Sequence, residues 1–384
     1  MNIVHIALCA PVTDGWSYQE NILTKFHKRL GHNVTLITSD LVWNNNGEKC
    51  KTDNLDYVNS DGVRIIRLIE KKKNPENRFR IFPALTDTLN TLDIDILFIH
   101  GCQFLDVFTL VKFIKKNKNI RVFVDNHADF GNSGGNFISR HILHGVLWKF
   151  CACLIEPYTV KFYGVLPARV DFLKTVYGLP PEKCELLVMG ADDDIISSVS
   201  DGVISSNIRS EYGIADSDFL IVTGGKITGY RKEVLDLLEA VAELANPHIK
   251  LLFFGVASDE FKERFDAACA SDSIINVGWQ PSEKTYGFLS AADLVIYPGL
   301  HSVMWEQTVA LGIPCIFRKI NGFDHVDIGG NALFFDDVSK DNFIKQLPAL
   351  ADKSSDKYIQ MYKVAQSPDK NKFLYSSIAL QSIS

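Results

Sequence analysis

The residues best suited to chemistry lie in one run of the second half of the chain, residues 291–317. An apolar stretch typical of a buried strand ends there at Tyr297 and is followed by Pro-Gly. Ser302 is a suitable cap for a helix after this loop, and the N–H groups at the start of such a helix bind anions. Glu306 would lie in the first or second turn. There a carboxylate either accepts hydrogen bonds from ligand hydroxyls or only complements the helix dipole, and the local pattern leaves both interpretations open.

A second candidate is the run Val-Thr-Gly-Gly-Lys-Ile-Thr-Gly-Tyr-Arg-Lys-Glu at residues 222–233, which follows a predicted strand. Glycines let a ligand approach the backbone, and cations neutralise phosphate, an Arg in a bidentate manner and a Lys as a point charge. We interpret the run as a phosphate-binding loop, with a solvated basic turn as the alternative. The residues proposed for it are Gly225, Lys226, Arg231 and Lys232, and Gly255 after the next predicted strand offers a further glycine turn.

The first half of the chain offers two weaker signals. Gly15 stands between the first predicted strand and the first predicted helix, where it allows a ligand to approach closely. His127 follows a predicted buried strand and is flanked by Asp125 and Asp129, which would orient the ring. A histidine taken alone is more often structural, but ligands bind at the carboxyl ends of parallel strands. His127 is therefore predicted as a site residue, and His100, at the end of the preceding strand, is a weaker candidate.

These residues require a framework of buried parallel strands. Both halves alternate short apolar runs with amphipathic helical patterns, which predicts an α/β fold of two doubly wound, Rossmann-like domains with parallel sheets. Ligands of such sheets are expected in the cleft between the domains. The predicted strands are residues 2–9, 33–38, 63–68, 95–100, 120–125, 161–166, 219–223, 249–254, 274–277, 294–297 and 315–317. The predicted helices are residues 18–30, 232–244, 259–268, 283–290, 303–311 and 340–350.

Length and composition agree with two domains. The chain has 384 residues, too many for one core, with 46% hydrophobic and 22% charged residues. The first domain is predicted at residues 1–190, completed by a C-terminal helix at 366–384, and the second at 191–365, with a Ser- and Asp-rich linker at 195–205. Residues 1–185 carry 23 Lys and Arg against 19 Asp and Glu, and the remainder carries 17 against 27. Either the first half faces something anionic, or both surfaces are ordinary.

The expected location is the cytoplasm. The first residues read as a strand rather than as a signal peptide, and no run of ~20 apolar residues predicts a membrane-spanning helix. The eight cysteines include no Cys-x-x-Cys pair, so neither zinc nor disulfides are expected. The triplet Asp192–Asp194 invites a metal interpretation, but it follows a Gly-Ala turn at the predicted linker and is interpreted as structural.

One apolar segment, residues 142–154, leaves a membrane contact open. Basic clusters occur nearby in the first half, at Lys71–Lys73 and at Lys112, Lys115, Lys116 and Lys118. The segment is either a core helix or an interfacial helix with Trp148 and Phe150 at the headgroup boundary.

The run at residues 291–317 resembles the donor-binding segment of the retaining GT-B glycosyltransferases of the glycogen-synthase-like group, family 4, whose bacterial members act on capsule, O-antigen and exopolysaccharide. The family pattern is Glu, seven residues, Glu, and then Ala-x-Gly-x-Pro. Glu306, Ala310, Gly312 and Pro314 match its second part. Its first Glu falls on Pro298, so the groups nominated to replace it are His301, Ser302 and the loop backbone at Val303.

The resemblance also implies roles for the other candidates. Lys226 takes the Arg position and Lys232 the Lys position of the pair that holds the donor diphosphate, with Arg231 as the substitute for Lys232. Gly15 would lie near the diphosphate, His127 would contact the donor sugar, and Asp125 and Asp129 would lie on the acceptor side. Catalytic roles are thereby expected for His127, Lys226, Lys232 and Glu306.

The implied reaction is retaining transfer of a hexose or N-acetylhexosamine from a nucleoside diphosphate sugar to a glycan, with UDP favoured over GDP. The family's acceptors are often lipid-linked, which would bring the enzyme to the inner face of the membrane. No metal, no other cofactor and no nucleic acid are expected. The alternatives are a nucleotide-sugar epimerase on the same fold and a non-catalytic two-domain sugar-binding protein.

Overall fold

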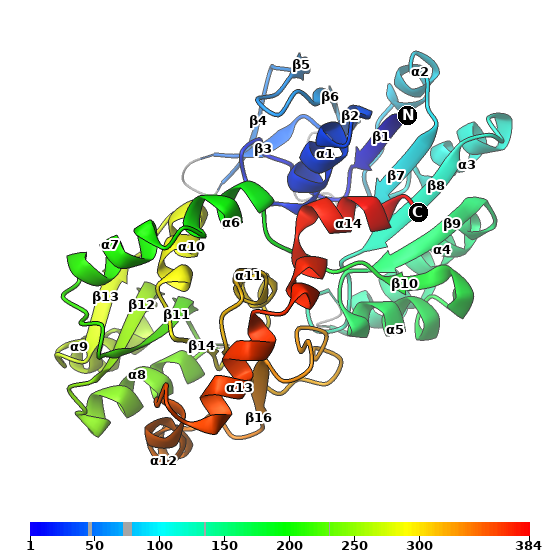
Figure 1. The fold of residues 1–384 in the computed structure, drawn as a ribbon. Coiled ribbons are helices and arrows are strands. Elements are labelled where there is room, and N and C mark those ends of the chain that lie inside the picture. The colour runs from blue at the N-terminus through cyan, green and yellow to red at the C-terminus, as the bar shows by residue number, and fades with distance from the viewer. Residues whose placement is uncertain (45–47, 72–78, 134–135, 230) are drawn as a thin grey trace. The chain divides into compact units, whose positions relative to one another are not determined.

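Two sheets organise the chain, and the structure, a computed structural model, describes residues 1–44, 48–71, 79–133, 136–229 and 231–384. Each sheet lies in its own unit (Figure 1). Unit 1 holds residues 1–189 and 375–384, and unit 2 holds residues 190–374. The return to the first domain was predicted at residue 366, but it occurs at residue 375. The short helix η5 (Pro368–Phe373) packs against α11 (Met304–Leu311) of unit 2, so only α14 (Tyr375–Ser382) belongs to unit 1.

Unit 1 is built on a sheet with the strand order β10-β9-β8-β7-β1-β2-β6-β5, in which only β5 pairs antiparallel. All residues of β7 are buried, as expected for a parallel strand covered on both faces. The strands are β1 (Asn2–Ala7), β2 (Asn33–Ser39), β5 (Asp56–Val58), β6 (Arg64–Leu68), β7 (Ile96–His100), β8 (Arg121–Asn126), β9 (Thr159–Gly164) and β10 (Cys184–Leu186), with a separate hairpin of β3 (Leu41–Trp43) and β4 (Lys49–Lys51). The helices are α1 (Gln19–Arg29), α2 (Leu85–Asn90), α3 (Val107–Lys116), η1 (Ile138–Trp148), α4 (Lys149–Ile155), η2 (Glu156–Tyr158), α5 (Pro167–Thr175), η3 (Pro181–Lys183) and α14.

Unit 2 is built on a fully parallel sheet with the order β13-β12-β11-β14-β15-β16. The chain therefore reverses its direction of winding next to β11, and the carboxyl ends of β11 and β14 adjoin, which is where ligands bind in such sheets. The strands are β11 (Phe219–Ile227), β12 (Ile249–Ala257), β13 (Ile274–Gly278), β14 (Leu294–Tyr297), β15 (Cys315–Arg318) and β16 (Ala332–Phe335). The helices are α6 (Asp193–Val199), α7 (Val203–Glu211), α8 (Glu233–Leu244), η4 (Asp259–Phe261), α9 (Lys262–Cys269), α10 (Ser282–Ser290), α11, α12 (Lys340–Leu350), α13 (Asp356–Ala365) and η5.

All eleven predicted strands are present, with ends that differ by at most a few residues. The predicted linker at residues 195–205 is wrong, because α6 and the start of α7 occupy it. Asp192 starts α6 as a cap, since its Oδ1 accepts a hydrogen bond of 3.0 Å from the backbone N–H of Asp194. Asp193 and Asp194 lie in the first turn, where carboxylates complement the helix dipole. These contacts give the triplet a structural role at the start of α6.

The apolar segment at residues 142–154 lies within one helix, Ile138–Tyr158, which begins in π-helical geometry (η1) and continues as α4. By length and composition alone this helix is able to cross a membrane, and a third of its most apolar window is buried. Trp148, Cys151 and Ile155 belong to the core of unit 1. The expectation that Trp148 lies at a surface is therefore wrong, whereas Phe150 is exposed.

Candidate functional site

Two glycines bring β11 and β12 together at the carboxyl edge of the unit 2 sheet. Gly225 and Gly255 are register partners with φ of +124° and +150°. A Cβ atom on Gly255 would lie 1.9 Å from the carbonyl oxygen of Gly225, so no other residue fits. Gly255 is thus explained by strand packing. Both glycines also leave this edge without side chains where a ligand would approach the backbone.

Of the three cations predicted here, Arg231 is the one that lies over this edge. Its Nη1 lies 3.8 Å from the position of a Cβ on Gly225, and its Cγ lies 3.6 Å from that of a Cβ on Gly299, in the Pro-Gly loop after β14. Lys226 is exposed at the penultimate position of strand β11, and Lys232 is exposed at the N-cap of α8. In the described part of the chain no ion pair engages Lys226 or Arg231. The structure thus brings the Arg231 guanidinium, rather than Lys232, to the glycine-lined edge.

The loop after β14 leads directly into α11. Val303, rather than the predicted Ser302, is the N-cap residue, so the helix begins one residue later than predicted. Oγ of Ser302 nevertheless accepts a hydrogen bond of 3.2 Å from the backbone N–H of Met304. The helix therefore starts at the end of the predicted anion-binding loop, with the loop backbone leading into its first turn.

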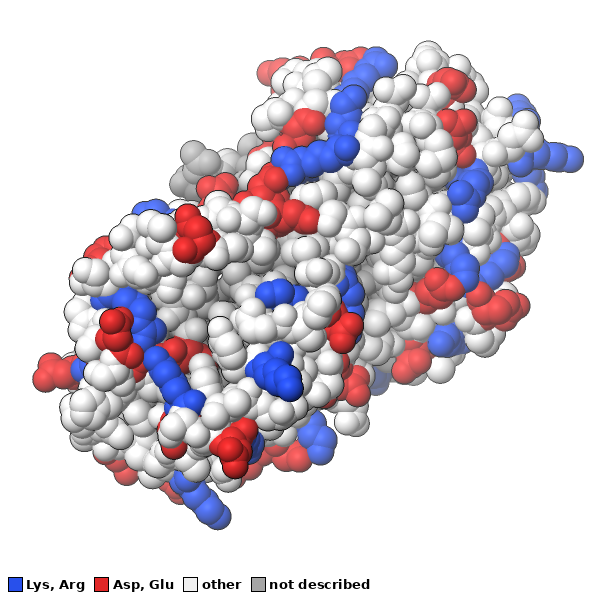
Figure 2. All heavy atoms as spheres, in the orientation of Figure 1, with Lys and Arg blue, Asp and Glu red and all other residues white. Residues whose placement is uncertain are grey.

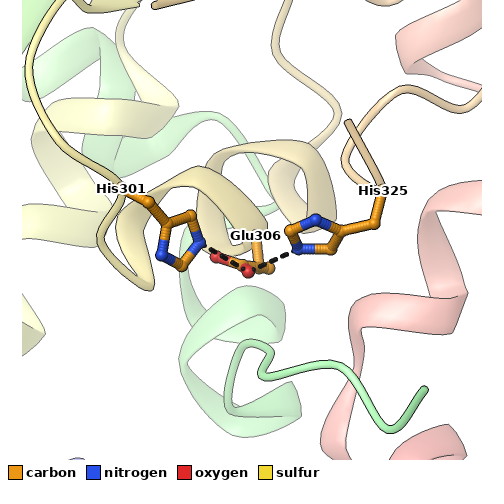
Figure 3. A group of neighbouring side chains, drawn as sticks. All are labelled: His301, Glu306 and His325. Atoms are coloured by element: carbon orange, nitrogen blue, oxygen red, sulfur yellow. Dashed lines mark hydrogen bonds and ion pairs between the residues drawn. The ribbon is translucent and has the colours of Figure 1, made fainter. Parts of the chain in front are cut away.

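Glu306 lies on the buried side of α11 between two histidines (Figure 3). Its Oε1 is 2.9 Å from Nε2 of His301 and 2.8 Å from Nε2 of His325, and Glu306 itself has no exposed surface. Burial raises the pKa of the Glu306 carboxyl group, but His301 and His325 lower it by a larger amount. The net effect is a pKa of about 2. Glu306 lies in the first turn of α11, where its charge also complements the helix dipole, so the structure leaves the ligand and dipole interpretations both open.

Both histidines donate to the same oxygen, so in their neutral forms both carry hydrogen on Nε2 and leave Nδ1 as an acceptor. Oε2 of Glu306 and Nδ1 of His325 are buried and have no hydrogen-bond partner among the described residues. One ligand atom from each of the three residues lies within 4.8 Å of the others, a spacing able to hold a metal ion. His325 was missed by the sequence analysis, since a histidine in a polar loop 19 residues after Glu306 carries no local signal.

In unit 1 the predicted His127 and Asp125 are neighbours. Nε2 of His127 lies 3.5 Å from Oδ2 of Asp125, and 37% of the His127 side chain is exposed whereas Asp125 is fully buried. Burial lowers the pKa of His127, but the Asp125 carboxylate raises it more strongly, to above its ordinary value. His100 also contacts Asp125, with its Nδ1 2.7 Å from Oδ2. The weaker candidate His100 therefore belongs to the same cluster.

Asp129 and Gly15 have different surroundings. The Oδ1 of Asp129 accepts hydrogen bonds from the backbone of Gly131 and Asn132, and its Oδ2 pairs with Arg169 at 2.9 Å. These contacts stabilise a turn, so a structural role is enough to account for an aspartate at position 129. Gly15 is exposed with a φ of +74° and nothing near the position of a Cβ, which fits an open turn.

Residues 205–366 match the model of a family described as Glycosyl transferases group 1. Among solved structures, the chain is similar to Anabaena Alr3699/HepE in complex with UDP, with 14% identity over 99% of this chain and 98% of that one and a TM-score of 0.70. It is also similar to a glycosyltransferase from Rickettsia africae, with 13% identity over 99% and 96% and a TM-score of 0.67. A third is WaaG, a glycosyltransferase involved in lipopolysaccharide biosynthesis, with 14% identity over 99% and 98% and a TM-score of 0.64. No curated protein sequence matches the chain.

Proposed function

We propose that this chain, a glycosyltransferase with the GT-B fold, transfers a hexose or N-acetylhexosamine with retention from a nucleoside diphosphate sugar to a growing glycan of a surface polysaccharide. The observation that carries the proposal is the carboxyl edge of the unit 2 sheet. There Arg231 lies beside Gly225 and Gly299, and α11 begins at the end of the adjoining loop. UDP is favoured as the nucleotide over GDP, and HepE was solved with UDP and with UDP-glucose.

The residues of this edge suit the departure of a diphosphate. Negative charge grows on the leaving group as the glycosidic bond breaks, and preorganised cations and N–H groups stabilise that charge. Lys226 and Arg231 would supply the cations and the first turn of α11 the N–H groups. The resemblance to the retaining family implies attack on the same face of the sugar with the leaving phosphate as base, while His127 contacts the sugar. The resemblance assigns the ribose to Glu306, but its partnerless Oε2 is fully buried, so this hydrogen bond would require the surrounding loop to open.

A thermal-shift panel followed by an activity assay tests this function. Nucleoside diphosphates, UDP most strongly, should raise the melting temperature, because a ligand that binds only the folded state stabilises it. Stabilisation by free sugars alone would support the sugar-binding alternative. Conversion of the donor sugar without any acceptor would support the epimerase.

We expect transfer activity to persist in excess EDTA. The predicted reaction relies on cations of the protein itself, and hydrogen bonds already account for both Nε2 atoms of the His301–Glu306–His325 cluster. The measurement is the transfer rate before and after chelation, with the metal content determined in parallel. A loss of activity that Zn²⁺ or Mn²⁺ restores would contradict the prediction and identify the cluster as a metal site, which His325→Ala should then abolish.

A lipid-linked acceptor would require contact with a membrane, and the helix η1–α4 offers a surface for it. Its outer face carries an apolar stripe in which every residue is more than half exposed: Phe137, Ile138, Ile142, Val146 and Phe150. The stripe continues onto α3, where the Phe108 ring lies 5.9 Å from that of Phe150. Lys112 is exposed one turn further along α3. The opposite face is packed in the core, so the helix suits an interface rather than a span.

Figure 2 shows positive and negative side chains interspersed on the face that it draws, so that face carries no broad basic patch. Of the basic clusters named above, Lys72 and Lys73 lie outside the described residues. The proposed membrane contact rests on the exposed apolar stripe.

We expect the protein to sediment with anionic vesicles at low salt and to be partly released at high salt, because salt screens the cations beside the stripe. The triple change Ile142→Ser, Val146→Ser, Phe150→Ser should abolish sedimentation at any salt concentration. As a matched control, Ile359→Ser removes a similarly exposed side chain from α13 and should change nothing. If the wild-type protein does not sediment, the lipid-linked acceptor loses its main support.

A further inference from the structure

Three buried histidines of unit 1 form a continuous hydrogen-bonded chain that ends on Asp125. Nδ1 of His27 lies 2.9 Å from Nε2 of His5, and Nδ1 of His5 lies 3.0 Å from Nε2 of His100. Nδ1 of His100 lies 2.7 Å from Oδ2 of Asp125. The four residues come from α1, β1, β7 and β8, and none is more than 3% exposed. The strands β1, β7 and β8 are neighbours in the sheet (Figure 1), which aligns the side chains in one row.

The other end of this row of histidines contacts the C-terminal helix α14. Figure 1 shows α14 beside α1, and Nε2 of His27 lies 3.1 Å from the carbonyl oxygen of Ala379 and 2.9 Å from Oγ of Ser382. The Ser382 hydroxyl donates to the same carbonyl at 2.9 Å, so its oxygen accepts from His27. A carbonyl oxygen only accepts. Nε2 of His27 must therefore carry a hydrogen.

This one requirement determines which ring nitrogen of each histidine in the row carries a hydrogen. A neutral imidazole has one donor and one acceptor, so Nδ1 of His27 accepts from His5 and Nδ1 of His5 accepts from His100. In a neutral His100 the hydrogen would thus be on Nε2, and its bare Nδ1 would face a carboxylate oxygen at 2.7 Å. Two acceptors at that distance repel each other. The row is satisfied when it holds one proton more than three neutral histidines and one carboxylate.

We infer that the extra proton resides on His100, which forms a buried imidazolium–carboxylate pair with Asp125, and that the Ala379 carbonyl holds it there through His27 and His5. The three histidines are positioning residues for His127, an inference that rests on the proposed function for its role in transfer. The pair leaves Asp125 ionised but nearly cancels its charge. Nε2 of His127 lies 3.5 Å from Oδ2 of Asp125. The C-terminal helix α14 thereby moderates the proton affinity of His127.

The surroundings agree with this location of the charge. Burial lowers the pKa of His5 far below its ordinary value and that of His27 to about 4, so these two are the neutral members. Burial raises the pKa of Asp125, but His100 and His127 lower it more. Burial also raises the pKa of the nearby Cys9 thiol to about 12.

Further charged groups face the row from neighbouring elements. Cys102 lies near Asp125 and stays a thiol, because burial raises its pKa well above the ordinary value. Glu20 and Arg169 act on His127 with opposite signs, and His32 acts on His27. Arg80 faces Cys9. In the part of the chain that the structure describes, none of these groups hydrogen-bonds to His5 or His100.

Nitrogen-15 NMR of histidine-labelled protein at pH 8 tests the inference without any assay of transfer. The wild-type spectrum should show one imidazolium with both ring nitrogens protonated, assigned to His100 by its loss in His100→Gln. His27→Phe frees His5 to donate from Nδ1, so that a neutral His100 donates to Asp125 and the imidazolium signal disappears. His27→Gln retains a donor toward Ala379 and an acceptor toward His5, so the signal should remain. If phenylalanine prevents folding, His27→Met interrupts the row with a flexible side chain.

The same samples report on His127. Loss of the His100 charge leaves Asp125 uncompensated, so His27→Phe should raise the pKa of His127 by about one unit or more, while His27→Gln and the exposed-site control His248→Gln should not. An upward shift of the pH profile of kcat in His27→Phe alone should follow if His127 takes part in transfer. Absence of a wild-type imidazolium at pH 8, or its persistence in His27→Phe, overturns the inference. If the imidazolium is present in the wild type and lost in His27→Phe, an unshifted kcat profile refutes only the role of His127.

Discussion

Replacing Arg231 with alanine is expected to lower kcat for sugar transfer by about 10²–10³-fold, the usual effect of removing one preorganised charge-stabilising donor. Arg231 lies against Gly225 and Gly299 at the carboxyl edge of the unit 2 sheet, and no ion pair within the described residues neutralises it. Lys226→Ala should have an effect of similar size. Steady-state kinetics over a range of donor concentrations measure both.

Lys232→Ala is the matched control, because it removes an exposed cation from the adjacent position at the N-cap of α8. It should change kcat only a few-fold and leave the melting temperature unchanged. Arg231→Lys should recover only part of the activity, since an ammonium group cannot grip phosphate in a bidentate manner. Should Lys232→Ala abolish turnover while Arg231→Ala does not, the assignment of Arg231 to the diphosphate is wrong.

Glu306→Ala is expected to lower the free energy of unfolding by about 3 kcal/mol or more. The substitution removes a buried carboxylate that accepts hydrogen bonds from His301 and His325, and each hydrogen bond to a charged group contributes roughly 1.5–3 kcal/mol. It also leaves two buried N–H groups without an acceptor. Urea denaturation followed by tryptophan fluorescence measures the change.

The same carboxylate should make stability depend on acid pH. The pKa of Glu306 is lowered from 4.5 to about 2 in the folded protein, so its contribution is complete above about pH 4.5 and is lost as the pH falls toward 2. The shift corresponds to roughly 3 kcal/mol. The difference in stability between the wild type and Glu306→Gln should therefore be largest at neutral pH and shrink below pH 4. A difference that stays constant from pH 7 to pH 3 would show that Glu306 keeps an ordinary pKa.

The order of strands and helices was largely predictable from the sequence. Buried parallel strands appear as apolar runs, and the helices between them show one apolar face, so both signals are local. The short strands β3, β4, β5, β10 and β16 were missed because three or four residues at a sheet edge carry little pattern. The linker at residues 195–205 was wrong for a related reason. Serine and aspartate are common in loops, but here Asp192 caps a helix whose packing outweighs the weak helix propensity.

Site residues that follow strand ends were also within reach of the sequence, since a strand end in a parallel sheet fixes the edge at which its next residues lie. Glu306, Lys226, Arg231 and His127 were proposed on that basis. The choice between Arg231 and Lys232 could not be made from the sequence. The side chains of adjacent residues point in different directions, and only the folded backbone shows which one contacts Gly299.

The sequence by itself thus determined the fold class, the two wound units and the edges that carry ligand-binding residues, because periodicity and strand ends are properties of short segments. Only the tertiary structure decided which side chains share a proton or a hydrogen bond. His325 meets Glu306 across a loop, and His27 meets Ser382 across 355 positions of the chain. Such contacts arise when separate elements pack, and their chemistry depends on donor and acceptor positions that no local pattern encodes.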